Sequence, residues 1–347
     1  MRILARRPRL AILALACVVL GGATFASDVG STAIRSVDPL LQPQIRGDFT
    51  VLTYNVKGLP WPAASGRPAA LRLIGDQLMA MRKAGVQPDV VLLQEAFVAD
   101  AKAIGAKAGY RYSVTGPDQA MANSLAGSGK GTRRWYIGET QGKQLDSGLV
   151  ILSDFPLSQV RRAVFGPDHC AGLDCLAAKG TLLARVAISA GRHVTIATTH
   201  LNSAGASKAP RQEADAAFGR QTRGLVRFVQ EHWNRSDPLV LAGDFNVGRK
   251  PRRAESLSAA TRSLGAASSD RNALLTCLHL SDCKIVRQRE AEQIGRRAKD
   301  MQMITDGRLA GLEPVSASIP FPVANGLSDH AGFMIGYRFI PMDELSR

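Results

Sequence analysis

Residues 239–246 read LVLAGDFN, an aliphatic run that ends in an aspartate and an asparagine. A short apolar run with such a boundary is typical of a strand buried on both faces, and these strands belong to sheets that are covered by helices. A carboxylate that closes a buried strand costs free energy unless it is paired or binds a metal ion. The segment therefore predicts a layered α/β fold with a polar site at a strand end.

Six further runs of this kind are bounded by Gly, Pro, Asp or Asn, and they predict strands over 49–56, 90–93, 148–152, 181–188, 193–199 and 332–339. Apolar residues at three- and four-residue intervals predict helices near 71–81 and 216–233. The segments 113–147 and 249–276 are rich in Gly, Ser, Ala and Arg, which favours long surface loops. Since no repeat or linker divides the chain, we expect one large domain over 48–340.

The composition agrees with a globular protein. The chain has 347 residues, of which 45% are hydrophobic and 21% charged, so a disordered or fibrous protein is excluded. Aromatic residues make up only 5%, which disfavours an aromatic carbohydrate groove or a platform that stacks single-stranded bases. The one long apolar run lies at the N-terminus, so a polytopic membrane protein is excluded as well.

Residues 1–26 predict a cleaved secretory signal peptide. Four arginines precede an apolar run over 10–20, and small residues follow it up to Ala26. A single membrane anchor is the alternative, but the run is short for a spanning helix. We therefore expect a secreted or periplasmic protein, with a loosely attached leader over 27–47 and a tail over 341–347.

The net charge of +15 falls to +11 without the four signal arginines, and it favours anionic partners. Nucleic acid, phospholipid surfaces and phosphorylated small molecules all fit this charge, and so does solubility alone. Without Cys17, four cysteines remain in two close pairs, Cys170 with Cys175 and Cys277 with Cys283. An oxidising compartment favours two local disulfides, although four cysteines allow three pairings. A zinc site is the alternative, but the spacings are not those of a zinc ribbon.

Polar side chains close or flank five of the predicted strands, and none of them is needed for a core. Each has a structural explanation when taken alone, such as a turn cap, a partner for an arginine or a core histidine. Together they favour a functional site, because reactive groups gather at strand ends of a rigid scaffold. The residues are Asn55, Glu95, His200, Asp244, Asn246, Asp329 and His330.

The chemistry of this set is that of a hard cation next to a proton acceptor. Oxygen ligands outnumber imidazoles and no cysteine is included, which suits Mg²⁺ or Mn²⁺, with Ca²⁺ as a further candidate. A hard cation with a histidine that takes a proton from water is typical of phosphoester hydrolysis.

The same motifs, in the same order, resemble the signature of the endonuclease/exonuclease/phosphatase (DNase I-like) superfamily. They read Tyr-Asn-Val at 54–56, Gln-Glu at 94–95, Thr-His-Leu at 199–201, Gly-Asp-Phe-Asn at 243–246 and Ser-Asp-His at 328–330. The resemblance covers 48–340. It implies a four-layer α/β sandwich, with two central mixed β-sheets flanked by helices and the site at one end.

On the metal side, the resemblance implies that Glu95 is the principal ligand with Asn55 beside it. Asp329 resembles a further carboxylate on that side. Asp244 resembles the carboxylate that orients the attacking water or holds a second metal ion.

On the substrate side, His330 resembles the general base and Asn246 a contact to the phosphate. His200 resembles the second histidine, which holds phosphate oxygens or assists the leaving group. Asp300 matches the aspartate that orients the base, although the aromatic residue that usually flanks it is absent.

Several segments are similar to the neutral sphingomyelinase branch. Residues 55–60 read NVKGLP, with Lys57 where that branch has Trp, and 147–153 read SGLVILS. The Lys179-Gly180 pair is the most discriminating, since nucleases of the superfamily generally lack it. A lysine before a glycine turn can present its ammonium to a phosphate with little obstruction from the backbone. The alternative is that Lys179 is a lysine of a surface turn without a role in the site.

Three substrate classes remain open at this point. Lys179 favours the headgroup of a sphingomyelin-type phospholipid, and the Arg-rich segment 249–253 favours nucleic acid, with phosphomonoesters as a third choice. Trp61 and the pair Trp135-Tyr136 are candidates for peripheral membrane contact. A binding protein without catalysis is the remaining alternative, and we expect no obligate protein partner.

Overall fold

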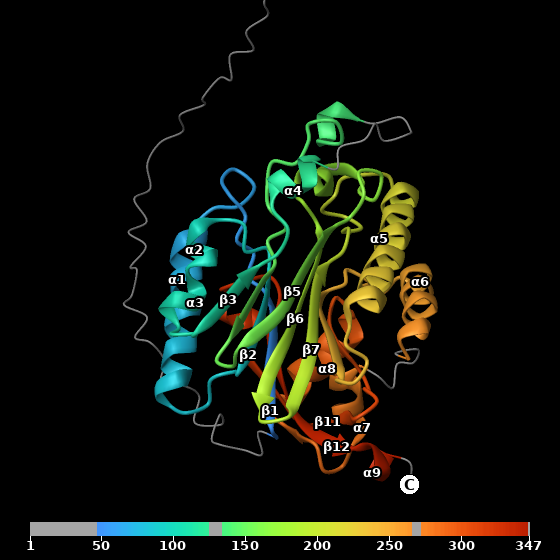
Figure 1. Ribbon diagram of the computed structural model, residues 1–347. Coiled ribbons are helices and arrows are strands. Elements are labelled where there is room, and N and C mark those ends of the chain that lie inside the picture. The colour runs from blue at the N-terminus through green and yellow to red at the C-terminus, as the bar shows by residue number, and fades with distance from the viewer. Residues whose placement is uncertain (1–46, 125–133, 266–271, 346–347) are drawn as a thin grey trace, which may run out of the picture. The chain divides into compact units, whose positions relative to one another are not determined.

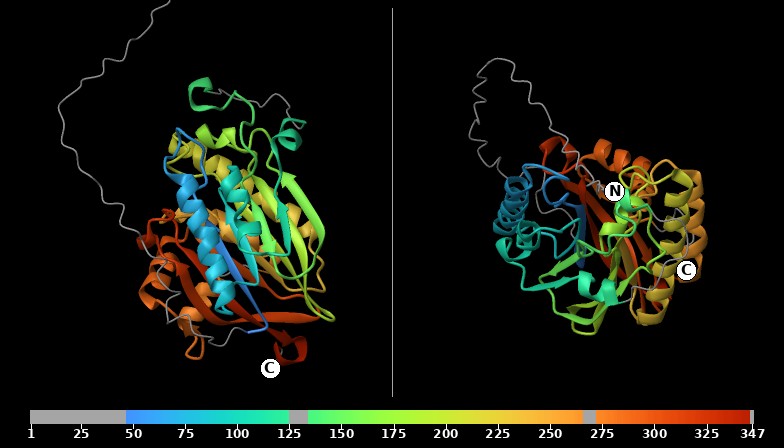
Figure 2. Two further views of the ribbon diagram at one scale, coloured as in Figure 1. Left: turned by 90° about the vertical axis from the view of Figure 1, so that its left-hand side faces the viewer. Right: turned by 90° about the horizontal axis from the view of Figure 1, so that it is seen from above.

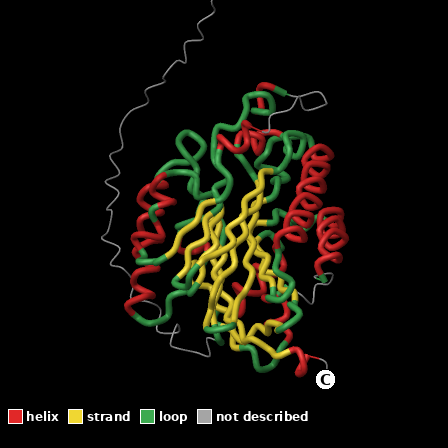
Figure 3. Tube along the Cα trace, viewed as in Figure 1, coloured by secondary structure: helices red, strands yellow, loops and turns green. Residues whose placement is uncertain are grey.

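The computed structural model describes residues 47–124, 134–265 and 272–345, all within one compact unit, Ser36–Arg347. The predicted signal peptide, and the leader except for Gly47, lie outside the described residues. Two β-sheets lie face to face with helices outside them, as Figures 1 and 3 show. Within the described ranges, no helix has both the length and the apolar character that crossing a bilayer requires.

The larger sheet has seven strands and is mixed. Strand β1 pairs parallel with β2 and antiparallel with β12, and β9 pairs parallel with β11. The strand order is β3 (Tyr112–Thr115), β4 (Val150–Ser153), β2 (Val90–Gln94), β1 (Phe49–Asn55), β12 (Gly332–Pro341), β11 (Ala310–Phe321) and β9 (Lys284–Ile285).

The smaller sheet has five strands, of which β7 and β8 are parallel and the other neighbours antiparallel. The strand order is β10 (Asp300–Thr305), β8 (Leu239–Asp244), β7 (Arg192–His200), β6 (Gly180–Ser189) and β5 (Leu157–Val164).

Alternation along the strands produces three apolar layers. Val51 packs between the two sheets, whereas its neighbour Leu52 packs beneath the helices on the outer face of the larger sheet. Those helices are α1 (Arg67–Lys83), α2 (Ala99–Lys102) and α3 (Ile104–Lys107). On the other side, α5 (Arg211–His232) and α6 (Pro251–Thr261) cover the smaller sheet through residues such as Leu225 and Leu257. The predicted four-layer sandwich is confirmed (Figure 2).

The remaining helices are short, apart from α8. Helix α7 (Ala273–His279) contacts β10 and β11, one strand from each sheet. The others are α4 (Gln119–Ser124), α8 (Gln288–Arg297), α9 (Met342–Leu345) and the 3₁₀ helices η2 (Trp135–Ile137), η3 (Gly172–Leu176), η4 (Arg262–Leu264) and η6 (Val323–Asn325).

The predicted loop over 249–276 is wrong, because helices α6 and α7 lie in it. Its Ala and Arg residues are strong helix formers, and α6 buries Arg253, Leu257 and Thr261 at four-residue spacing. The described parts of 113–147 contain only the rest of β3, α4 and η2 besides loops. Both cysteine pairs form the expected local disulfides, Cys170–Cys175 and Cys277–Cys283.

The topology brings the polar strand ends together. Parallel strands end at the same edge of a sheet, so Asn55 on β1 lies beside Gln94 on β2, and His200 on β7 beside Asp244 on β8. Strand β10 is antiparallel to β8, and its first residue, Asp300, pairs with Asp244. These ends lie at the top of the sandwich in Figure 1, where β7 leads towards α5.

Candidate active site

Asp300 and His330 form a buried pair. Nδ1 of His330 lies 2.7 Å from Oδ2 and 3.0 Å from Oδ1 of Asp300. Burial acts to lower the pKa of His330, but Asp300, followed by Asp244, outweighs it and raises the pKa to about 10. Since Nδ1 faces Asp300, the other ring nitrogen, Nε2, is turned towards Asp244, whose Oδ2 is 3.8 Å away.

One amide joins two carboxylates. The Nδ2 group of Asn55 donates to Oε1 of Glu95 at 3.0 Å and to Oδ2 of Asp244 at 3.1 Å. Its Oδ1 accepts from the backbone N–H of Lys57, which fixes the orientation of the amide. Asn55 therefore links the ends of the two sheets at the point where their carboxylates meet.

The two carboxylates are in surroundings that disfavour their negative charge. Burial raises the pKa of Glu95, although the hydrogen bond from Asn55 and the charge of Lys179 oppose this. Burial, followed by repulsion from Asp300, raises the pKa of Asp244 to about 7. A divalent cation would remove this penalty, because it stabilises both carboxylates in their charged form.

The donor set fits a hard cation. In the described part of the chain, ligand atoms of Asp244, Asp300 and His330 lie within 4.8 Å of one another. Asp300 and Nδ1 of His330 already bind each other, so the oxygens of Glu95 and Asp244 are the better ligands for Mg²⁺ or Mn²⁺. Asn55, predicted as a ligand, turns its Nδ2 donor towards these oxygens and positions both carboxylates instead. In this arrangement the Asp300–His330 pair stays available for proton transfer.

His200 is a neutral imidazole between a cation and two carboxylates. Its Nε2 lies 3.2 Å from Nζ of Lys179, 3.6 Å from Oδ2 of Asp244 and 4.0 Å from Oε1 of Glu95. Burial, then the charges of Lys179 and His330, hold its pKa well below the usual range. The ring can therefore accept a hydrogen bond from Lys179.

Lys179 is buried and contributes its ammonium to this cluster. Only 4% of the residue is exposed, and Nζ contacts Oδ1 of Asp174 at 3.1 Å and the carbonyl oxygen of Leu201 at 3.0 Å. The surface-lysine alternative is therefore wrong. The expected glycine turn is also absent, since Gly180 begins β6, where a Cβ would lie 2.0 Å from the carbonyl oxygen of Ala163.

Asn246 and Asp329 lie at different depths. The Asn246 side chain donates to the carbonyl oxygen of Leu201 at 3.0 Å, and its backbone N–H donates to Oδ1 of Asp244 at 2.9 Å. The side chain of Asp329 is 60% exposed and faces Nζ of Lys57 at 3.5 Å. The structure therefore brings Asn246 to the buried group and leaves Asp329 at its rim.

Two buried arginines that the sequence analysis did not identify brace the loops of the site. Arg67 donates to the carbonyl oxygens of Val56 and Leu327, which connects the end of β1 to the segment before His330. Arg253 donates to the carbonyl oxygens of Asn202 and Asn246.

Both arginines lie in the first turn of a helix, where an arginine usually remains in water. For Arg253, the buried face at four-residue spacing was the signal available in the sequence. Since Arg253 is 1% exposed, the segment 249–253 presents fewer charges to a nucleic acid than its composition predicted.

Comparison with known proteins bears on the family of this chain. The sequence model of the Endonuclease/Exonuclease/phosphatase family matches residues 52–277. A sphingomyelinase of Mycobacterium bovis is 27% identical over 206 residues, which is 58% of this chain and 35% of that protein. A sphingomyelinase of Mycobacterium tuberculosis matches to the same extent. The chain thus spans about a third of the length of these relatives.

Solved structures share the fold. The beta toxin of Staphylococcus aureus, as a mutant with bound magnesium ions, superposes with a TM-score of 0.57 at 16% identity over 83% of this chain and 99% of its own. Sphingomyelinase C from Streptomyces griseocarneus gives 0.56 at 21% identity, covering 83% and 98%. TDP2 from D. rerio, complexed with single-strand DNA product, gives 0.52 at 15% identity, covering 84% and 98%.

Proposed function

The chain belongs to the Endonuclease/Exonuclease/phosphatase family, and on this premise we propose that it is a divalent-metal-dependent phosphodiesterase. The observation that carries the proposal is the convergence of Asn55, Glu95 and Asp244 beside the Asp300–His330 pair. Buried carboxylates with raised pKa values next to an oriented imidazole are typical of hydrolytic sites.

Each residue has a chemical role in this proposal. Bound Mg²⁺ or Mn²⁺, held by the oxygens of Glu95 and Asp244 that Asn55 positions, would supply positive charge that offsets the charge of the phosphate. In its neutral form, which the charge of a bound cation would favour, His330 takes a proton from the attacking water at Nε2, while Asp300 holds the ring and stabilises the imidazolium that results. Asp244 accepts a hydrogen bond from the water and so directs it at the phosphorus.

The phosphate side of the site has its own cation. The carbonyl oxygen of Leu201 accepts hydrogen bonds from Nζ of Lys179 and from Nδ2 of Asn246. Lys179 also contacts Nε2 of His200. The Lys179 ammonium contacts a phosphate oxygen as charge develops, and His200 orients that ammonium by accepting a hydrogen bond from it at Nε2.

As substrate we propose the headgroup diester of a sphingomyelin-type phospholipid. Support comes from the sphingomyelinases among the relatives and from Lys179, which points into the site. Nucleic-acid diesters are the alternative, in keeping with the net charge of the chain. The burial of Arg253 weakens the argument for a nucleic-acid substrate that rested on the arginines of the segment 249–253.

We further propose that the protein is secreted or periplasmic and contacts membranes peripherally. Its basic and apolar N-terminus and its two disulfides support export. Trp61 and Trp135 are 83% and 72% exposed, and the β1–α1 loop and η2 that carry them lie at the end of the sandwich where the site is (Figures 1 and 2). Exposed tryptophans of this kind favour a bilayer interface.

A substrate screen tests this function. Protein lacking residues 1–26 is incubated with sphingomyelin vesicles or with plasmid DNA, in Mg²⁺ or in EDTA. We expect release of phosphocholine in Mg²⁺, loss of activity in EDTA and intact plasmid. Nicked plasmid with intact vesicles would show that the substrate is nucleic acid and not lipid. Activity on neither substrate would contradict the proposal that the protein is a phosphodiesterase.

A further inference from the structure

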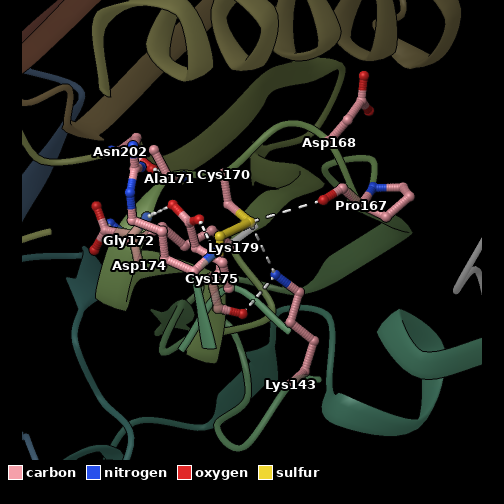
Figure 4. The surroundings of a disulfide bond; sticks show 12 residues. Lys143, Pro167, Asp168, Cys170, Ala171, Gly172, Asp174, Cys175, Lys179 and Asn202 are labelled. Atoms are coloured by element: carbon pink, nitrogen blue, oxygen red, sulfur yellow. Dashed lines mark hydrogen bonds and ion pairs between the residues drawn. A yellow bond between two sulfur atoms is a disulfide. The ribbon is translucent and has the colours of Figure 1, made fainter. Parts of the chain in front are cut away.

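The Cys170–Cys175 disulfide closes residues 170–175 into a ring next to Lys179 (Figure 4). We propose that this ring, which we call the disulfide ring, positions the active site by holding Asp174 against Lys179. The proposal rests on the phosphodiesterase function above and adds a redox-sensitive support to it. Opening the ring then lowers turnover in a chain that remains folded.

Asp174 connects the ring to the site with both carboxylate oxygens. Its Oδ1 lies 3.1 Å from Nζ of Lys179, and its Oδ2 accepts from the backbone N–H of Ser203 at 2.5 Å. Lys179 in turn contacts Nε2 of His200. Asp174 is adjacent to Cys175, so the disulfide limits the movement of the backbone that carries this carboxylate.

The ring is also docked on the segment that follows His200. The N–H of Ala171 donates to Oδ1 of Asn202 at 3.0 Å, and the N–H of Leu173 donates to the carbonyl oxygen of Ser207 at 2.7 Å. Gly172 has a positive φ of 63°, and a Cβ there would lie 1.9 Å from that same carbonyl oxygen. The backbone of the ring therefore has one close-fitting position.

The covalent closure adds to these contacts by restricting the backbone between them. The ring contains a single turn of 3₁₀ helix, η3, and the S–S bond removes alternative backbone conformations from it. If Asp174 moves away, a buried ammonium loses its carboxylate partner, which is costly in a site that excludes water. Lys179 would then leave the position in which it faces His200 and a bound phosphate.

The disulfide ring is the more accessible of the two disulfides. Cys170 is half-buried, whereas Cys277 and Cys283 are 0% and 8% exposed and belong to the core between the sheets. Nζ of Lys143 lies 3.9 Å from Sγ of Cys170. A dithiol such as dithiothreitol supplies two electrons and two protons, which converts the S–S bond into two thiols while the dithiol closes to its own cyclic disulfide.

Removal of one disulfide at a time tests the proposal. The variant Cys170→Ala/Cys175→Ala is compared with the control Cys277→Ala/Cys283→Ala for hydrolysis of sphingomyelin in detergent micelles with Mg²⁺. We expect kcat to fall about tenfold in the first variant, because a misplaced binding group slows the chemical step, and to stay near wild type in the control. Circular dichroism and thermal unfolding check that both variants are folded. Unchanged kcat in a folded first variant would overturn the proposal.

A double-mutant cycle shows whether the ring acts through Lys179. Lys179→Met is made in the wild-type chain and in the Cys170→Ala/Cys175→Ala variant. We expect a large loss of kcat in the first background and a loss smaller by about tenfold in the second, because the ring has already released the lysine. Fully additive losses would show that the ring supports only the fold and would contradict the proposal.

Two measurements on the intact chain apply if the cysteine variant does not fold. Asp174→Asn, with its cysteines intact, is expected to lower kcat to a similar extent. Titration of wild-type protein with dithiothreitol is expected to lower kcat in step with alkylation of Cys170 and Cys175, read by mass spectrometry, before Cys277 reacts. Full activity in either experiment overturns the role of the ring but leaves the phosphodiesterase intact. A wild-type chain that hydrolyses neither sphingomyelin nor bis(4-nitrophenyl) phosphate would instead remove the function itself.

Discussion

Nδ1 of His330 lies 2.7 Å from a carboxylate oxygen of Asp300, and the two residues come from different sheets. Asp300 begins β10 of the smaller sheet, whereas His330 precedes β12 of the larger one. The pair is therefore formed only when the sandwich closes. This relationship makes the histidine an oriented base, and it connects the catalytic proposal directly to the fold.

The first prediction concerns this pair. We expect His330→Ala to lower kcat by about a hundredfold or more, because the general base is lost. Asp300→Asn should lower kcat less than His330→Ala does. It should also move the ascending limb of the pH–rate profile, where activity rises with pH, to lower pH, because the carboxylate that raises the pKa of His330 is removed.

The pair Asp168–His169, 3.7 Å apart with the aspartate exposed and the histidine half-buried, offers a control away from the site. Asp168→Asn should leave both kcat and the pH–rate profile near wild type. An Asp300→Asn enzyme with the wild-type profile would show that Asp300 does not control the base.

The second prediction concerns stability and pH in EDTA. Burial raises the pKa of Asp244 from 3.8 to about 7, so the folded chain binds its proton more tightly than the unfolded chain. The free energy of unfolding should therefore fall as pH rises from about 4 to about 7. The pKa of His330 is raised from 6.5 to about 10, so the free energy of unfolding should continue to fall between these two pH values.

Urea unfolding at pH 5 and at pH 8 measures this dependence. Mg²⁺ should stabilise the protein most at pH 8, because the ion competes with protons for Glu95 and Asp244. Asp244→Asn should flatten the metal-free dependence between pH 4 and 7. A metal-free protein that becomes more stable from pH 5 to pH 8 would contradict the electrostatic description of the site.

The third prediction concerns Arg253, whose Nε pairs with Asp215 at 2.5 Å. Arg253→Met should lower the free energy of unfolding by about 3 kcal/mol, because the half-buried carboxylate of Asp215 loses its nearest partner and two carbonyls lose their donor. It should also lower kcat, since the loop of Asn246 is no longer held. The neighbouring exposed Arg252→Met serves as the control in the same urea titration, and equal effects of the two would refute a bracing role for Arg253.

The fourth prediction concerns membrane contact. Trp61→Ala/Trp135→Ala should weaken sedimentation with sphingomyelin vesicles by about tenfold, while hydrolysis of soluble bis(4-nitrophenyl) phosphate is unchanged. Leu309, 73% exposed in the turn between β10 and β11, provides the control variant Leu309→Ala. Wild-type vesicle binding by the tryptophan variant would place the membrane contact elsewhere.

The sequence predicted the strands that are apolar runs and missed those that are not. Strands β1, β2, β4, β6, β7, β8 and β12 were found, because both of their faces are buried or nearly so. Strand β5 is an exposed edge with two arginines, and β11 contains Pro314 and Pro320 with register shifts, so neither shows a clear period. Strand β10 was indicated only by the family resemblance at Asp300.

The site was predictable where chemistry and position coincide at a strand end. Asn55, Glu95, Asp244 and His200 are of this kind, and the structure brings them together. Asp329 belongs to the same motif as His330 but lies at the rim of the site, because the side chains of adjacent residues in a turn point in different directions. The partner of Lys179 and the bracing roles of Arg67 and Arg253 depend on contacts between distant loops, which no local pattern encodes.

The central claim is that Glu95 and Asp244, positioned by Asn55, hold a divalent cation beside His330. Crystals soaked with Mn²⁺ test it most directly, through the anomalous scattering of the ion. The account predicts an anomalous peak about 2.2 Å from an oxygen of Glu95, lost in a Glu95→Gln variant that is also inactive. A chain that hydrolyses phosphodiesters in EDTA, with Mn²⁺ absent from this position in the soaked crystals, would contradict it.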